Sequence, residues 1–205
     1  MTTTQPVIKY NGLLFEHPVA RDKTGGQTRV ECHRGITTLR ERGHQRNPLL
    51  HEYASLVFDK LEGRTEETQS LIEEILQDPG EFTGHLWLRT NGTVWDFQEA
   101  EFHPTMDGKS YELNTPDSYR QKTRLEFDGS STIVSLSSLP EHISLHLFKR
   151  KTAQIPTEMR NNTRIYLPPR DVLSPVIFGM SGGKHYFINA RNHPAVSRGV
   201  SYDSG

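Results

Sequence analysis

The feature that most constrains the fold is an Asn91-Gly92 pair set between two segments of alternating apolar residues, 85–90 and 93–97. Asn-Gly favours the positive φ angles of a type I′ turn, and the twist of that turn matches the twist of paired strands. The sequence therefore predicts a two-residue β-hairpin at this point of the chain.

The predicted turn also determines which residues of the hairpin face one another. If the two threonines that flank the turn pair, the next partners on the same face follow at every second residue. These pairs are Thr90 with Thr93, Leu88 with Trp95, and Leu86 with Phe97. The leucines and the aromatic residues are expected to form one apolar face that turns inward.

Residues 48–77 have the apolar spacing of helices. Leu50, Tyr53 and Val57 recur at three- and four-residue intervals, and a second such stretch follows Gly63. We expect an antiparallel helical hairpin here. The other apolar runs are short, and they predict strands at 7–10, 13–16, 28–32, 124–127, 132–136, 143–148, 164–167, 176–180 and 184–188.

This order of elements predicts an α+β fold. We expect a mainly antiparallel, twisted β-sheet or partly open barrel, with the helical hairpin of about residues 48–77 packed against it. The 205 residues fit a single domain, residues 1–205. Short disordered tails are expected at about residues 1–5 and 195–205.

Composition points to a protein of a reducing compartment. Cys32 is the single cysteine, which excludes an internal disulfide framework and any zinc site with two thiolates. The first ten residues lack the basic and apolar regions of a secretory signal, and the apolar runs are too short to span a membrane. We therefore expect a soluble protein of the cytoplasm or nucleus with no membrane partner.

The net charge of −1 hides an uneven distribution along the chain. Residues 1–46 hold 8 basic and 4 acidic groups, residues 47–119 hold 4 and 15, and residues 120–205 hold 12 and 6. The thirds of the chain can neutralise one another once folded. Alternatively, they form an acidic and a basic surface, and the basic surface meets an anionic partner.

Cys32 and His185 form one candidate catalytic pair, because a thiol nucleophile needs an imidazole to take its proton. His185 follows a glycine-rich turn and opens an apolar strand, far downstream of the cysteine. This layout resembles papain-like cysteine hydrolases. The resemblance implies that Asn189 or Asn192 orients the imidazole. Because residues 28–32 are expected to form a strand, no helix is predicted to begin at Cys32.

Arg34 is the centre of a second candidate enzyme site. The segment His33 to Thr37 resembles the arginine motif of arginine–serine–glutamate ADP-ribosyltransferases, and residues 129–132 resemble their serine motif. The resemblance implies that Arg34 holds cofactor phosphates. Asn161 and Thr163 stand where the acidic residues of that family are expected, and Glu158 lies a few residues upstream.

Basic clusters give a third reading, an anion-binding surface. The expected anion-binding residues are Arg34, Arg40, Arg42, Lys149, Arg150 and Lys151. Nucleic-acid binders combine such clusters with exposed aromatic residues, and the clusters here are not interleaved with aromatics along the sequence.

Metal binding is not expected. His142 and His146 are four residues apart, but residues 143–148 read as a strand, on which the two imidazoles would lie too far apart to share an ion. No catalytic constellation is complete and no cofactor is implied. The sequence thus predicts an interaction module, viral or effector-like, that holds a protein or nucleic acid. A thiol hydrolase or an ADP-ribosyltransferase-like enzyme is the alternative, and the oligomeric state stays open.

Overall fold

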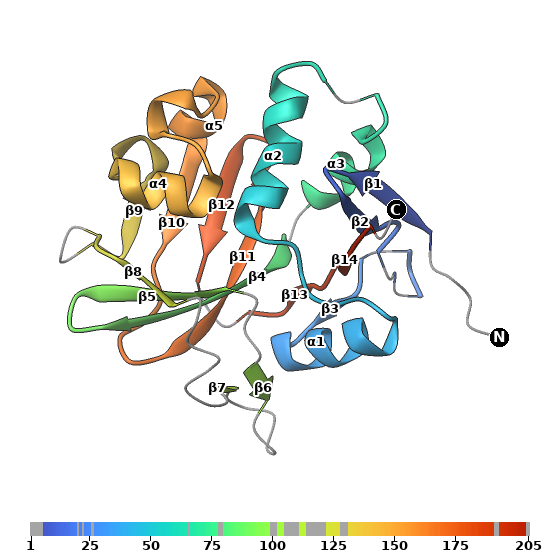
Figure 1. Ribbon diagram of the computed structural model, residues 1–205, viewed down its shortest axis with the longest axis horizontal. Helices are drawn as coiled ribbons and strands as arrows, with labels where there is room; N and C mark the ends of the chain where they lie inside the picture. The colour runs from blue at the N-terminus through green and yellow to red at the C-terminus, as the bar shows by residue number, and fades with distance from the viewer. Residues whose placement is uncertain are drawn as a thin grey trace.

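The computed structural model has a large β-sheet with helices on both sides (Figure 1). It describes residues 6–19, 21, 23–25, 27–64, 66–77, 80–98, 102–104, 111–113, 122–127, 131–190 and 193–203. The helices are α1 (Cys32–Glu41), α2 (Leu50–Leu61), α3 (Gln69–Ile75), α4 (Glu141–Phe148) and α5 (Thr157–Asn162), with short 3-10 helices η2 (Leu136–Ser138) and η3 (Thr152–Gln154).

The strands fall into three sheets. They are β1 (Val7–Tyr10), β2 (Leu13–Glu16), β3 (Arg29–Val30), β4 (Glu81–Thr90), β5 (Thr93–Gln98), β6 (Phe102–Pro104), β7 (Tyr111–Leu113), β8 (Lys122–Leu125), β9 (Ile133–Ser135), β10 (Thr163–Tyr166), β11 (Leu173–Ser181), β12 (His185–Asn189), β13 (Ala195–Val196) and β14 (Val200–Tyr202). The large sheet has the order β3-β13-β4-β11-β12-β10-β9, and β5 pairs with both β4 and β8. A second sheet has the order β1-β2-β14, and β6 pairs with β7.

The predicted α+β class with a mostly antiparallel twisted sheet is confirmed. Most neighbouring strands of the large sheet run antiparallel, whereas β10 and β12 run parallel. In Figure 1, α2, α4 and α5 lie above this sheet, and α1 and the β6–β7 pair lie below it. Within the described residues, no helix combines the length and the apolar character needed to cross a bilayer.

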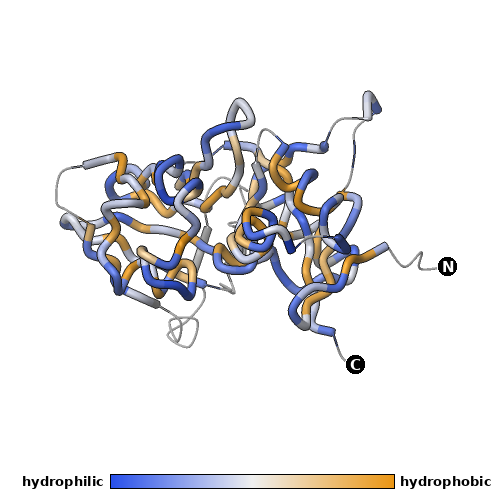
Figure 2. The backbone as a smooth tube through the Cα atoms, turned by 90° about the horizontal axis from the view of Figure 1, so that it is seen from above, coloured by the Kyte–Doolittle hydropathy of each residue, from blue (hydrophilic) through white to orange (hydrophobic). Residues whose placement is uncertain are grey.

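The inner face of the large sheet is the face that packs against α2, α4 and α5. Trp87, Val94, Phe178 and Ile188 point to this side and are buried in the main core. Tyr53 of α2 stacks on Phe178 with ring centroids 5.8 Å apart. Burying a large apolar side chain stabilises a fold by about 1.5–3 kcal/mol, so this layer supplies most of the hydrophobic stabilisation. Figure 2 shows hydrophobic stretches of the chain in the interior of the molecule.

The outer face is the opposite side of the same sheet, and α1 covers part of it. Cys32 of α1 packs with Phe82 and Ile177 in a small cluster, and Ile36 lies against that cluster and a neighbouring one around Leu86. The outer face is therefore apolar beneath α1, and its covering is thinner than that of the inner face.

The Asn91-Gly92 hairpin is confirmed in its register, and its predicted apolar face is buried in part: Leu86 and Phe97 are buried in a small cluster of their own. Asn91 and Gly92 have φ angles of 50° and 79°, and Leu88 pairs with Trp95 as expected. The main core, however, receives the other side of the hairpin, with Trp87 fully buried. The reason is that the helices cover the side that carries polar residues in the sequence, as described below.

The two helices predicted within residues 48–77 are present as α2 and α3. The first helix begins at Leu50, and Glu52 accepts a hydrogen bond from the backbone N–H of Leu49 at 2.7 Å. Asn47 donates to the carbonyl of Arg198 at 2.9 Å. This residue therefore links the start of the helix to the C-terminal segment. The predicted strands 7–10 and 13–16 are confirmed as β1 and β2.

One predicted strand is too long and another is wrong, because helices occupy some or all of their residues. The strand expected at 28–32 ends at Val30, and α1 begins at Cys32. The strand expected at 143–148 is helix α4. Ile143 and Leu147 are four residues apart and both fully buried, which is the spacing of one helical face.

The C-terminal segment also differs from the expectation, since a disordered tail was predicted from about residue 195. Residues 195–196 form β13 between β3 and β4, and residues 200–202 form β14 beside β2. Arg198 lies between the two strands with a fully buried side chain. This segment ties the small sheet to the large one.

Candidate functional site

The outer face carries a row of residues that crosses four strands. Arg124 of β8 pairs with Trp95 of β5, Trp95 pairs with Leu88 of β4, and Leu88 pairs with Leu173 of β11. Paired residues lie on one side of a sheet, so a guanidinium, an indole and two aliphatic side chains form a continuous strip. Trp95, Leu88 and Leu173 are half-buried.

A second row lies farther across the same face. Phe187 of β12 pairs with Arg164 of β10, and Arg164 pairs with Ser135 of β9. Tyr166 follows two residues after Arg164 and shares its side of the strand. Trp95 and Tyr166 are four strand spacings apart, which is about 19 Å across a flat sheet.

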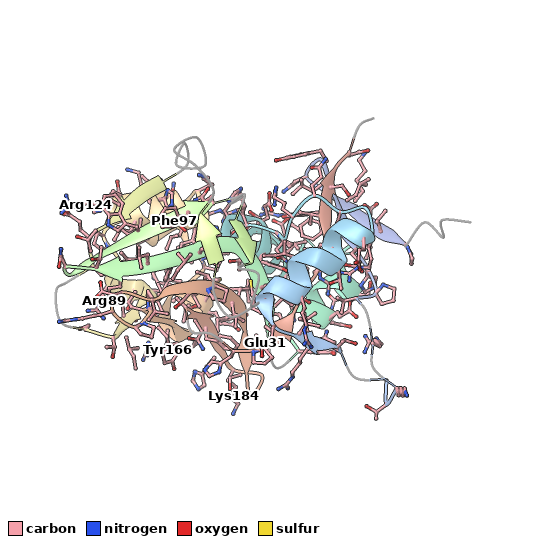
Figure 3. The ribbon with its side chains drawn as sticks, turned by 90° about the horizontal axis from the view of Figure 1, so that it is seen from below. Glu31, Arg89, Phe97, Arg124, Tyr166 and Lys184 are labelled. Carbon is pink, nitrogen blue, oxygen red and sulfur yellow. The ribbon has the colours of Figure 1, made fainter. Side chains whose placement is uncertain are left out.

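The cations of this face are exposed. Arg124 forms an ion pair with Glu126 at 2.9 Å, and both side chains are about 60% exposed (58% and 62%). Arg164 donates to the hydroxyl of Ser135 at 3.2 Å, and Lys184 is exposed at the turn before β12. Figure 3 looks onto this side of the molecule, with Arg124, Tyr166 and Lys184 spread over the sheet and Glu31 at the α1 end. Each row thus combines an arginine with an aromatic ring.

A buried polar cluster occupies the inner face, centred on Asp96 of β5. The carboxylate is fully buried and lies 2.9 Å from the Nδ1 atom of His85 and 2.6 Å from the Nε2 atom of His146. The indole N–H of Trp87 donates to it at 2.9 Å, and the amide of Gln98 donates at 3.1 Å. We call these five residues the Asp96 cluster.

The hydrogen bonds determine the protonation of the cluster. The backbone N–H of Leu50 donates to Nε2 of His85 at 3.1 Å, so that nitrogen carries a lone pair and Nδ1–H donates to Asp96. Nε2 of His146 lies 2.6 Å from a carboxylate oxygen and 2.9 Å from the amide nitrogen of Gln98, and in the tautomer with its hydrogen on Nε2 it donates to the carboxylate. Burial alone would raise the pKa of Asp96, but attraction by the two imidazoles and their hydrogen bonds hold it well below its usual range.

His146 is a part of the cluster that reaches the surface, as is Gln98. Its side chain is 18% exposed, whereas those of Asp96 and His85 are fully buried. Because Nε2 is bound to Asp96, Nδ1 is the ring nitrogen left to act on another molecule. His142 is exposed four residues earlier on α4, on the same side of the helix. The helical structure of residues 141–148 therefore overturns the expectation that a strand separates these two imidazoles.

The expected catalytic residues Cys32, His185 and Asn189 lie on the outer side of the sheet. Cys32 is 4% exposed and packs among apolar side chains at the start of α1. His185 is exposed at the first position of β12, and Asn189 ends that strand with a buried side-chain oxygen that lacks a hydrogen-bond partner. The thiol of Cys32 is thus buried, whereas the imidazole of His185 is exposed. Asn192 lies outside the described residues.

The expected anion-binding residues are spread over two places. Arg34 is exposed on α1, whereas Arg42 binds the buried carboxylate of Glu16 at 3.0 Å; the side chain of Arg40 is not among those described. The second cluster follows α4. Lys149 is exposed, but Arg150 pairs with Glu62 at 3.1 Å and Lys151 pairs with Glu141 at 3.1 Å. Several of these cations thus already have anionic partners.

A pocket of about 240 Å³ lies between the β1–β2 turn, α2 and β14. Tyr10, His51 and Tyr202 line it, and burial lowers the pKa of His51 to about 4. Glu52 of the same wall is held by Arg46 through two hydrogen bonds of 2.7 Å. The pocket therefore combines three aromatic rings with polar groups, and its carboxylate is already bound by an arginine. In the described part of the chain, no group of three or more histidine, cysteine or acidic side chains is arranged to hold a metal ion.

The sequence did not point to the outer rows or to the Asp96 cluster. Arg124, Trp95, Arg164 and Tyr166 are far apart in the chain, and only the strand order makes them neighbours. Alternation in the hairpin did contain a signal, because His85, Trp87 and Asp96 share one face of it.

Neither a family model, nor a curated protein, nor a solved structure matches this chain.

Proposed function

We propose that this protein binds single-stranded nucleic acid on the outer face of its large sheet. The observation that supports the proposal is the repeated pairing of an arginine with an aromatic ring, Arg124 with Trp95 and Arg164 with Phe187, on one side of the sheet. Proteins that bind single strands combine cations that follow the phosphates with rings on which bases stack. An anionic partner was expected from the sequence, and the proposal keeps it. The proposed binding site, however, is the outer face of the sheet and not the basic clusters of the sequence.

Single strands fit this face better than duplexes. A base must be unpaired and splayed out before it can stack on a side chain, and a loop or single strand provides such bases. The described face is formed by strands, with α1 at one end and the β6–β7 pair on the same side of the sheet (Figures 1 and 3). A ligand in the cytoplasm or nucleus would agree with the compartment expected from the single cysteine.

The first test is binding of a fluorescein-labelled 12-nucleotide single strand, followed by anisotropy at several salt concentrations. We expect the wild-type protein to bind single-stranded RNA and DNA more tightly than a duplex of the same length. The double variant Arg124→Gln/Arg164→Gln should bind more weakly. The slope of log K against log salt should also fall by about 1.4, since each lost phosphate contact contributes about 0.7 on a single strand.

Arg64→Gln is the matched control, because Arg64 is an exposed arginine that pairs with Asp59 in the α2–α3 region. Its affinity should equal that of the wild type. Equal affinities in the double variant and the control, or no binding of any strand at low salt, would show that the outer face is not a nucleic-acid site.

Glu126 offers a test with the opposite sign. Its carboxylate holds the guanidinium of Arg124 in an exposed ion pair, and a phosphate has to compete with it. We expect Glu126→Gln to tighten binding several-fold at low salt, because the variant frees one cation and removes one like charge from the ligand's path. The same anisotropy titration measures this change, and a weaker complex would contradict the placement of the phosphates.

A further inference from the structure

We propose that helix α4 presents a second, catalytic site at which His146 and His142 cleave RNA phosphodiesters by proton transfer, without a metal ion. The proposal goes beyond strand binding, and it places the chemistry on the helix side of the molecule. It stands on the geometry of the Asp96 cluster and on the helical spacing of the two histidines.

The first step of the argument is the pairing of His146 with Asp96. An imidazole whose Nε2–H is held by a buried carboxylate at 2.6 Å has a fixed tautomer and a fixed ring orientation. The carboxylate of Asp96 is held in position, because His85 and Trp87 of β4 also donate hydrogen bonds to it. Nδ1 of His146 is thereby directed away from Asp96 with a lone pair, which is what a general base needs.

The second step is the position of His142. Residues four apart on a helix have Cβ atoms about 5–6 Å apart, so two imidazoles at this spacing can reach opposite sides of one phosphate. His142 is exposed, and the ammonium of Lys149 lies exposed at the C-terminal end of the same helix. A base, an acid and a cation are the groups that phosphoester transfer within RNA requires.

The reaction balances with these residues alone. Nδ1 of His146 takes the proton of a ribose 2′-hydroxyl, and the 2′-oxygen forms a bond to the adjacent phosphorus. The bond from phosphorus to the 5′-oxygen breaks, and the leaving oxygen takes a proton from the imidazolium of His142. The products are a 2′,3′-cyclic phosphate and a 5′-hydroxyl. Asp96 is a positioning residue, since it acts through His146.

The test uses a 12-nucleotide DNA strand that contains a single ribonucleotide, labelled at one end, in the presence of EDTA. We expect the full-length protein to cut it at the ribonucleotide and to leave the all-DNA strand intact, with the cyclic phosphate identified by mass spectrometry. His146→Gln and His142→Gln should each slow cleavage by about 100-fold or more, because general acid–base groups contribute that much. His193→Gln, at an exposed histidine elsewhere, should cleave at the wild-type rate.

Two results would overturn the proposal. One is the absence of cleavage by folded wild-type protein above the blank without protein. The other is equal cleavage by the wild type and His146→Gln. Thermal unfolding of each variant shows that it is folded, and His142→Gln alters an exposed position that the core does not use. Binding of the all-DNA strand is measured in parallel, so failure of this activity stays separate from failure of strand binding.

Discussion

Replacing Arg198 with methionine is expected to lower the free energy of unfolding by about 3–5 kcal/mol, because it leaves buried carboxylates without their cation. The guanidinium binds Glu81 at 2.6 and 2.8 Å and Glu74 at 3.0 Å, and the side chain is fully buried. Glu81 also accepts a hydrogen bond from Tyr53 at 2.8 Å. Removing one partner of such a network costs far more than the net contribution of the intact network.

Urea unfolding at pH 7 measures this change, with Arg64→Met as the control. Arg64 makes its ion pairs in an exposed position, 59% accessible, so its replacement should alter stability by no more than about 1 kcal/mol. A loss below about 1 kcal/mol for Arg198→Met would mean that the C-terminal segment does not hold the small and large sheets together. Because β13 and β14 pair with both sheets, we expect Arg198→Met to lower the urea concentration at which the whole protein unfolds.

Asp96→Asn is expected to destabilise the protein by about 3 kcal/mol at pH 7, since hydrogen bonds to a charged acceptor contribute about 1.5–3 kcal/mol each. The amide keeps one acceptor oxygen but turns an N–H group toward the donors that now surround the carboxylate. At least one of His85, Trp87 and His146 then loses its partner in a buried place. Destabilisation of less than about 1 kcal/mol would contradict an ionised Asp96.

The pH dependence of the same variant has a definite sign. The pKa of Asp96 is lowered in the folded state, so the unfolded chain takes up the proton first as the pH falls. The stability that this carboxylate contributes is present above about pH 4 and is lost progressively below it. The difference in unfolding free energy between the wild type and Asp96→Asn should therefore narrow from pH 7 to pH 3. Glu74, whose pKa is also lowered, is present in both proteins and cancels.

The hairpin shows how far local sequence signals reach. Asn91-Gly92 correctly predicted the turn and the pairing of Leu88 with Trp95. It could not predict which face the helices cover, because alternation marks two faces and tertiary packing chooses between them. His85 and Asp96 lie on the face that was not predicted to turn inward, yet both are buried and hydrogen-bonded to each other.

Helix α4 shows a second limit. Its apolar residues are so close together in the sequence that they suggest a strand. A run of eight residues is too short for its hydrophobic periodicity to distinguish a helix from a strand. The helical period appears once Ile143 and Leu147 are seen to be buried together. The same reassignment brings His142 and His146 to one side of the helix, and the acid–base proposal depends on it.

The outer rows depend on contacts that no local pattern contains. β5 pairs with β8 across a long excursion of the chain, and β12 pairs with β10 in parallel. Contacts between residues so distant in sequence follow from the topology of the sheet. By contrast, the basic clusters that are visible in the sequence are partly neutralised by acidic partners in the fold, as Arg42 is by Glu16.

The most direct test of the proposed nucleic-acid site is tryptophan fluorescence, because the chain has only two tryptophans. Trp87 is fully buried, whereas Trp95 is half-buried on the outer face beside Arg124. A base that stacks on Trp95 should quench its emission when a 12-nucleotide single strand is added to saturation. We expect quenching in the wild type that is lost in Trp95→Phe. Equal fractional quenching in the two proteins, or unchanged wild-type emission in a complex that anisotropy detects, would contradict binding on this face.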